Sequence, residues 1–83
     1  MTSHPSTLAE RVFKYVERYA LRHALTRWPT VRQVARGLGV GQNRVMLTSM
    51  GDVRIEIQWC DVPTADLLIT VDSPRIQKLR ESM

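Results

Sequence analysis

Arginine is the residue type in this sequence with the clearest chemical use. The chain has 12 lysine and arginine residues, and ten of them are arginines. No acidic residue lies between Glu17 and Asp52, and this interval contains six arginines: Arg18, Arg22, Arg27, Arg32, Arg36 and Arg44. A guanidinium group can bind two phosphate oxygens at once, and a field of one sign over a small domain attracts polyanions. The alternative interpretation is a solvated basic face without a partner.

Residues that could support catalysis or metal binding do not gather in the sequence. The two histidines, His4 and His23, are far apart, and the single cysteine, Cys60, has no neighbouring ligand, so a zinc site is not expected. Residues 37–41 contain three glycines but lack the preceding strand of a phosphate-binding loop. The acidic residues are scattered. We therefore expect no enzyme activity, no metal and no cofactor, and a Cys60 thiol that is at least partly buried on a strand.

Length and composition indicate one small globular domain. The chain has 83 residues, of which 43% are hydrophobic and 24% charged, close to the average of soluble domains. No apolar run approaches the roughly 18 residues of a membrane span, and the start of the chain lacks the apolar region of a signal peptide. One cysteine cannot form an internal disulfide. These observations favour a cytoplasmic protein with no membrane partner.

A long amphipathic helix is predicted over residues 7–26, after a flexible tail at residues 1–6. Thr7 and Glu10 have the spacing of a capping box, in which each side chain binds the other residue's backbone N–H. Apolar residues then recur every three or four positions at Leu8, Val12, Val16 and Tyr19 or Ala20. Trp28-Pro29 is expected to end the helix, because the residue before a proline avoids helical geometry.

Two shorter helices joined by a tight turn are predicted over residues 30–51. Thr30 and Gln33 again have the spacing of a capping box. Gly39 stands where a helix ends on a left-handed residue, a conformation that glycine adopts without steric cost. Gly37 inside the first of these helices costs it about 1 kcal/mol relative to alanine, so this helix must depend on tertiary packing.

From residue 53 the hydrophobic period changes to two, which predicts a β-hairpin over residues 53–71. Val53, Ile55, Ile57 and Trp59 alternate with polar residues in the first strand, and Leu67, Ile69 and Val71 share one side of the second. Residues 60–66 form the connecting loop. Ser73-Pro74 then predicts a short helix over residues 73–82, with serine as the cap and proline in the first turn.

The segment from Val31 to Val45 resembles a helix-turn-helix motif. Ala35 would let the two helices cross closely, Gly39 would permit the turn, and Val45 would lock the second helix onto the first. With the hairpin that follows, the chain resembles the winged helix-turn-helix superfamily of small bacterial and phage DNA-binding proteins. The resemblance implies an α+β fold with three helices, a β-hairpin wing and a short C-terminal helix.

The resemblance also implies a DNA site. The second helix of such a motif enters the major groove, so Gln42, Asn43 and Arg44 would contact base edges, each good pair giving about 1–3 kcal/mol of discrimination. The residues implied as phosphate contacts are Thr30, Arg18, Arg22, Arg27, Arg32, Arg36 and Arg54. The expected function is sequence-specific binding of double-stranded DNA by a transcriptional regulator or a mobile-element architectural factor. Alternatively, Gln42 and Asn43 only cap or solvate the end of a helix.

Two features favour a different function, a winged-helix module that binds proteins and not DNA, such as a phage or plasmid inhibitor or an adaptor. Met46, Leu47 and Met50 are apolar where the DNA-facing side normally continues, and loop residues 60–66 include two acids and no base. Because one small domain makes few base contacts, a homodimer is also expected. The first or last helix would supply the contact, and the last helix carries three apolar residues, Ile76, Leu79 and Met83.

Overall fold

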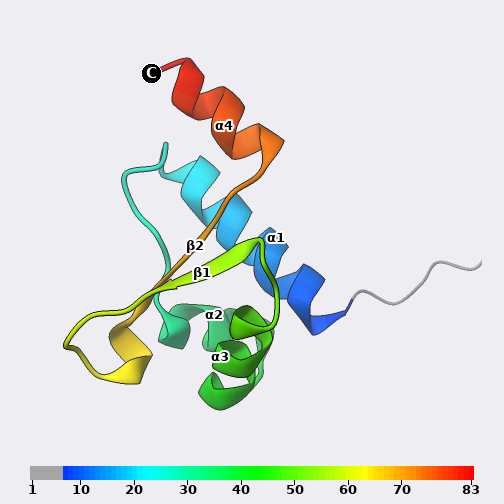
Figure 1. The fold of residues 1–83 in the computed structure, drawn as a ribbon, viewed down its shortest axis with the longest axis vertical. Coiled ribbons are helices and arrows are strands. Elements are labelled where there is room, and N and C mark those ends of the chain that lie inside the picture. Colours follow the sequence, from blue (N-terminus) through cyan, green and yellow to red (C-terminus); the bar gives the residue numbers. More distant parts are fainter. Residues whose placement is uncertain (1–6) are drawn as a thin grey trace, which may run out of the picture.

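The computed structural model describes residues 7–83, in which four α-helices accompany one antiparallel β-hairpin (Figure 1). The elements follow in the order α1 (Leu8–Arg22), α2 (Val31–Leu38), α3 (Gln42–Met50), β1 (Ile55–Gln58), the 3-10 turn η1 (Thr64–Asp66), β2 (Leu68–Val71) and α4 (Pro74–Glu81). The expected α+β class is confirmed. The tail predicted for residues 1–6 lies outside the described residues.

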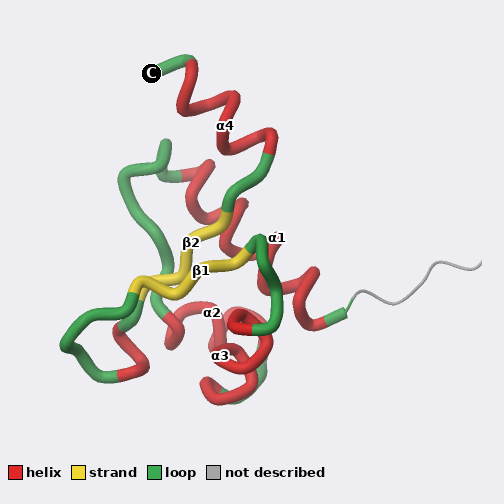
Figure 2. Tube along the Cα trace, in the orientation of Figure 1, coloured by secondary structure: helices red, strands yellow, loops and turns green. Residues whose placement is uncertain are grey.

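The hydrophobic core lies between one face of the hairpin and the helices α1, α2 and α3 (Figure 2). Ile55 lies opposite Val71 in the sheet, and Ile57 lies opposite Ile69. The period-two pattern predicted this inner face correctly. Its helical partners in the core are Val12, Val16, Val31, Val34, Ala35 and Val45.

The segment before α2 extends the sheet on the β2 side. Thr30 forms a β-bridge with Leu68, and two backbone bonds flank it: Val31 N–H donates to Leu67 O at 2.9 Å, and Ile69 N–H donates to Pro29 O at 2.9 Å. This segment therefore covers the outer edge of β2, whereas β1 forms the opposite edge of the sheet.

Side-chain caps begin three of the helices, as predicted. Thr7, Thr30 and Ser73 each accept a hydrogen bond from the backbone N–H three residues later, at 3.1 Å in every case. The capping box at Thr30 is complete, because Gln33 Oε1 accepts from Thr30 N–H at 2.8 Å. The box expected at Thr7 is wrong in its second half: the Glu10 carboxylate accepts from Arg54 Nη2, at 2.7 Å, and makes no return bond to Thr7.

Helix α1 ends at Arg22, four residues before the expected end. Ala24 N–H donates to Leu21 O, and Leu25 N–H donates to Ala20 O at 2.8 Å, which is the bond pattern of a Schellman motif. Ala24 and Leu25 both have positive φ, at 50° and 63°. Backbone bonds to the last helical carbonyls therefore end the helix before Pro29 is reached. The sequence did not indicate this end, because position 24 is an alanine and not the glycine that usually signals it.

Replacing Ala24 with glycine is expected to stabilise the fold. A left-handed conformation costs an L-residue roughly 1–2 kcal/mol, and glycine largely avoids this cost. We therefore expect Ala24→Gly to raise the free energy of unfolding by about 1 kcal/mol in urea titrations. Ala9→Gly in the first turn of α1 is the matched control and should lower that free energy. An equal loss in both variants would contradict the left-handed geometry at Ala24.

Two glycines of α2 and its turn have separate roles. Gly39 has φ 68° and ψ 34°, which confirms the predicted left-handed residue at the end of α2. At Gly37 a Cβ atom would overlap the ring of Tyr15, a residue of α1. The glycine that weakens α2 as an isolated helix therefore allows close contact between α2 and the Tyr15 side chain.

The first strand of the hairpin is shorter than expected. Val53 and Trp59 lie outside β1 and are 100% and 65% exposed, so the prediction that they belong to the half-buried first strand is wrong. A turn in which Ile55 N–H donates to Asp52 O precedes the strand, and pairing ends at Gln58 and Leu68. Cys60 is exposed in the loop beyond this point, which corrects the expectation of a buried or partly buried strand thiol.

The last helix packs on α1. Ile76 of α4 is fully buried within the chain, so its side chain is not free for a partner, whereas Met83 beyond the helix is 72% exposed. Helix α4 therefore covers one end of the core. Among residues 7–83, no helix combines the length and apolar character needed to cross a membrane.

Candidate nucleic-acid interface

The turn between α2 and α3 fixes how α3 is presented. Gly39 N–H donates to Arg36 O at 3.3 Å, and Val40 N–H donates to Ala35 O at 3.0 Å. Val45, on the first turn of α3, is fully buried against the core. Together these contacts hold the beginning of α3 at the surface, where Gln42, Asn43 and Arg44 are all exposed.

The exposed side of α3 changes character along the helix. Only Val45 and Ser49 of α3 are buried. Its N-terminal end carries two amides and a guanidinium group, whereas Leu47 and Met50 further along are 71% and 64% exposed. Arg44 projects about 120° around the helix axis from Met50, since each residue turns the helix by about 100°. Arg44 and Met50 are therefore separated around the helix axis, whereas Asn43 lies on the same side of α3 as Leu47 and Met50, which follow it further along the helix.

The structure also reveals a basic groove on α1. Arg11, Lys14, Arg18 and Arg22 recur at intervals of three or four residues and share one side of α1, over about 16 Å of helix. With Tyr15 and Leu38 they line a groove of about 290 Å³. Arg11 Nη2 donates to Leu38 O at 3.2 Å, so the groove reaches the residue before the turn that leads to α3.

Only part of this groove was expected from the sequence. Arg18 and Arg22 were among the expected phosphate contacts, but Arg11, Lys14 and Tyr15 were not. The signal that could have found Arg11 and Lys14 is their helical spacing from Arg18. The contribution of Leu38 could not be read from the sequence, because it depends on how α1 and α2 pack.

Two expected phosphate contacts are already paired within the fold. Arg32 Nη1 lies 2.8 Å from Asp66 Oδ1, in the loop of the hairpin. Arg54 Nη2 lies 2.7 Å from Glu10 Oε1 and 2.9 Å from Asp52 Oδ2, and its guanidinium group stands 4.4 Å from the centre of the Phe13 ring. The hydrogen bonds that Arg54 donates to the carboxylates of Asp52 and Glu10 raise the pKa of Arg54, and those that Asp52 accepts from Arg54 lower the pKa of Asp52. Arg54 therefore joins α1 to the start of β1.

Thr30 is likewise engaged inside the fold. Its hydroxyl accepts from Gln33 N–H, and its own N–H donates to Gln33 Oε1. The next amide, at Val31, donates to Leu67 O. Thr30, which was expected to contact a phosphate, and the amides of Thr30 and Val31 are thus already used to cap α2 and extend the sheet.

The remaining cations are open to solvent. Seven basic side chains in the first part of the chain are exposed and form no salt bridge within residues 7–83: Arg11, Lys14, Arg18, Arg22, Arg27, Arg36 and Arg44. They come from α1, from α2, from the segment between them and from the start of α3. The structure therefore leaves most of the basic surface expected from the sequence available to an anionic partner.

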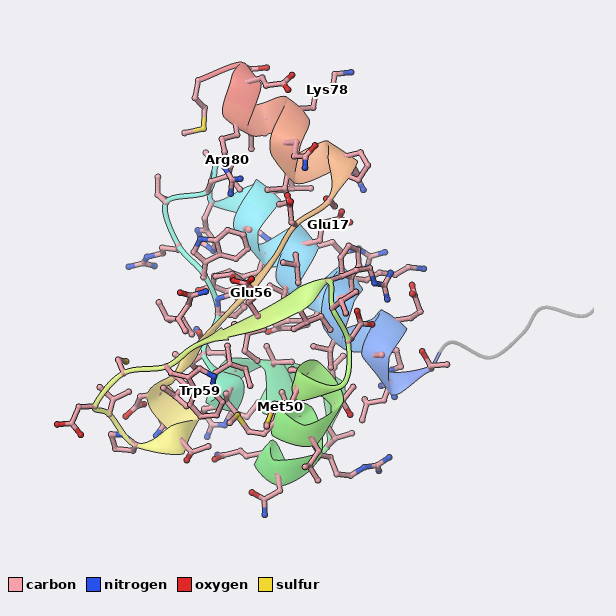
Figure 3. The ribbon with its side chains drawn as sticks, viewed as in Figure 1. Glu17, Met50, Glu56, Trp59, Lys78 and Arg80 are labelled. Atoms are coloured by element: carbon pink, nitrogen blue, oxygen red, sulfur yellow. The ribbon has the colours of Figure 1, made fainter. Side chains whose placement is uncertain are left out.

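A small apolar surface lies at the C-terminal end of α3. Met50 and Trp59 line a groove of about 320 Å³ together with Ser49, Ile55, Glu56 and Ile57. Figure 3 shows Met50 and Trp59 on one side of β1 and Glu56 on the other. Trp59 is 65% exposed although it is one of the largest apolar side chains in the protein. The groove thus runs between the end of α3 and the inner side of β1.

No group of three or more potential metal ligands of the His, Cys, Asp or Glu type occurs in residues 7–83. The site therefore consists of a helix pair with an exposed, polar helix start, a basic groove and a neighbouring hairpin. Comparisons of the chain with protein-family models, curated proteins and solved structures find no match.

Proposed function

We propose that this protein binds double-stranded DNA, as a winged helix-turn-helix domain in which α3 enters the major groove. In this proposal α2 and α3 form the motif, the hairpin β1–β2 is the wing, and the β-bridge between Thr30 and Leu68 joins the motif to the wing. Gln42, Asn43 and Arg44 read base edges at the exposed start of α3. Arg36 and the basic groove of α1 bind phosphates, whereas Arg54 has a structural role because two carboxylates already bind it.

The observation that carries this proposal is the set of seven exposed cations in α1, α2, the segment between them and the start of α3, none of which has a carboxylate partner within residues 7–83. Charge of one sign that is not neutralised within the fold repels itself, and a polyanion relieves that repulsion. Phosphate contacts of this kind position a protein on a duplex, and a few base contacts then provide specificity. The proposed role is that of a transcriptional regulator or an architectural factor.

Single substitutions should separate base reading from phosphate binding. We expect Arg44→Ala to relax the preference at one base position and to cost about 1–3 kcal/mol on the preferred site. Arg36→Ala should weaken all duplexes alike and reduce the salt slope of binding by about 1. Selection of oligonucleotides from a random pool would define the site, and titrations on that site and on a scrambled duplex would measure both effects. If neither substitution changes affinity, the assigned site is wrong.

A second candidate function follows from the apolar side chains of α3. Leu47 and Met50 are 71% and 64% exposed where a DNA-reading helix usually carries polar groups. Exposed apolar residues that gather in one place are typical of protein-binding surfaces. A protein-interaction module would show no duplex binding even at about 50 mM salt, a concentration low enough for phosphate contacts to give strong non-specific binding.

A further inference from the structure

The free edge of β1 presents backbone groups that no other segment of residues 7–83 pairs with. In an antiparallel ladder, alternate residues direct their N–H and C=O groups to opposite edges. Asp72 N–H donates to Arg54 O, so the even-numbered residues of β1 face β2. The backbone N–H and C=O of Ile57, and the C=O of Ile55, consequently face outward, while Ile55 N–H is used by Asp52 O.

Apolar side chains line this same edge. Trp59 follows β1 directly, and with Met50 and Ile55 it forms part of the groove beneath the strand. Natural proteins usually protect an exposed edge with a charge, a proline or a bulge. Within β1 the one charged residue is Glu56, which points to the opposite face of the sheet. The edge therefore offers both hydrogen-bonding groups and an apolar surface to a further strand.

We propose that the further strand is β1 of a second copy of this chain, paired antiparallel across a two-fold axis at Ile57. The two Ile57 residues would exchange two backbone bonds, and each Trp59 N–H would donate to the partner's Ile55 carbonyl. This register places each Trp59 opposite Ile55 of the other copy, on the inner side of the sheet. There the Trp59 side chain of each copy enters the groove beside Met50 of the other copy. Each copy therefore supplies both an inserted tryptophan and a groove that receives one, as a two-fold interface requires.

Charge selects the register at Ile57, and symmetry favours a second copy over an unrelated strand. The register at Ile57 places Glu56 opposite Gln58 of the other copy, whereas a register centred on Glu56 would oppose two carboxylates. Because the two-fold axis runs perpendicular to the sheet, both α3 helices lie on the same side of the four-stranded sheet. Two identical reading helices on one side are what a palindromic DNA site needs. The pairing itself does not depend on DNA and replaces the contact through α1 or α4 that the sequence led us to expect.

Cysteine pairs can test this register in a Cys60→Ser background without DNA. Glu56 and Gln58 are exposed and would face each other at a position without backbone bonds, where Cα atoms lie about 4.5 Å apart, within disulfide range. Residue 56 of one copy and residue 56 of the other are offset by two residues along the strands, roughly 7 Å, in addition to the gap between the strands. They are therefore too far apart for a disulfide. Under mild oxidation we expect a disulfide when Glu56→Cys and Gln58→Cys variants of different tag length are mixed, and little cross-linking in either alone.

The oligomeric state provides the second measurement. The unmodified protein should elute as a dimer, Trp59→Lys as a folded monomer, and Met83→Lys, a matched change at a 72% exposed residue on the other side of the fold, as a dimer. Cross-linking of either cysteine variant with itself at the level of the mixture would overturn the register. A monomeric unmodified protein without cross-links would overturn the pairing and leave the edge to a strand of another protein. Neither result decides whether the monomer binds DNA, so the two proposals can fail separately.

Discussion

Replacing Lys14, Arg18 and Arg22 together by glutamine is expected to make duplex binding less dependent on salt. The slope of log affinity against log salt concentration should become less steep by about 2–3. Each phosphate contact releases condensed counterions and contributes about 0.9 to that slope. If six or more of the exposed cations contact phosphates, the unmodified protein should lose about 10³-fold in affinity between 50 and 200 mM salt. Fluorescence anisotropy of a labelled random duplex at several salt concentrations measures both quantities.

A matched control removes the same charge from another part of the molecule. Arg75, Lys78 and Arg80 are three exposed cations of α4, and their replacement by glutamine changes the net charge by the same amount. If the basic groove of α1 contacts the phosphate backbone of the duplex, the α4 variant should keep most of the original salt slope. Equal reductions in the two variants would mean that only net charge matters, and the α1 groove would no longer be part of the interface.

Ile69→Ala is expected to have the largest effect on stability. Ile69 is fully buried at the centre of β2, opposite Ile57, and its N–H binds Pro29 O at the edge of the sheet. Truncation removes buried methyl groups and leaves a cavity, which typically costs about 2–5 kcal/mol for isoleucine. Since small domains have about 5–15 kcal/mol in total, a large part of the unfolding free energy should disappear in urea titrations.

The neighbouring residue is the control for this prediction. Leu68 points to the other face of β2 and is 39% exposed, so Leu68→Ala removes less buried surface and should cost much less than Ile69→Ala. A slip of one residue in a strand would exchange the two faces. A greater loss in Leu68→Ala than in Ile69→Ala would therefore show that the strand register is wrong.

Local sequence signals predicted the parts of the fold that depend on neighbouring residues. The caps at Thr7, Thr30 and Ser73 act on amides three residues away, and Gly39 satisfies a local backbone requirement. Alternation predicted the inner face of the hairpin for the same reason, because successive side chains of a strand point to opposite faces. The end of α1 was missed because Ala24 adopts a conformation for which glycine is the usual signal.

The candidate site was less predictable because ion pairs join residues that are distant in the sequence. Arg54 is 44 residues from Glu10, and Arg32 is 34 residues from Asp66. Composition shows an excess of arginine, but it does not show which guanidinium groups will pair with carboxylates inside the fold. The exposure of Gln42, Asn43 and Arg44 was expected from their place at the start of a helix, whereas the groove on α1 required the packing of Leu38 against it.

The contact between Gly37 and Tyr15 links the interior of the helix pair to the surface chemistry of α1. The Tyr15 ring occupies the space that any side chain at position 37 would need, and the same ring forms a wall of the basic groove. Enlarging residue 37 would displace the ring and reshape the groove without altering a single charge. If the groove binds phosphates as proposed, a larger residue at position 37 is therefore expected to change that binding through the shape of the groove alone.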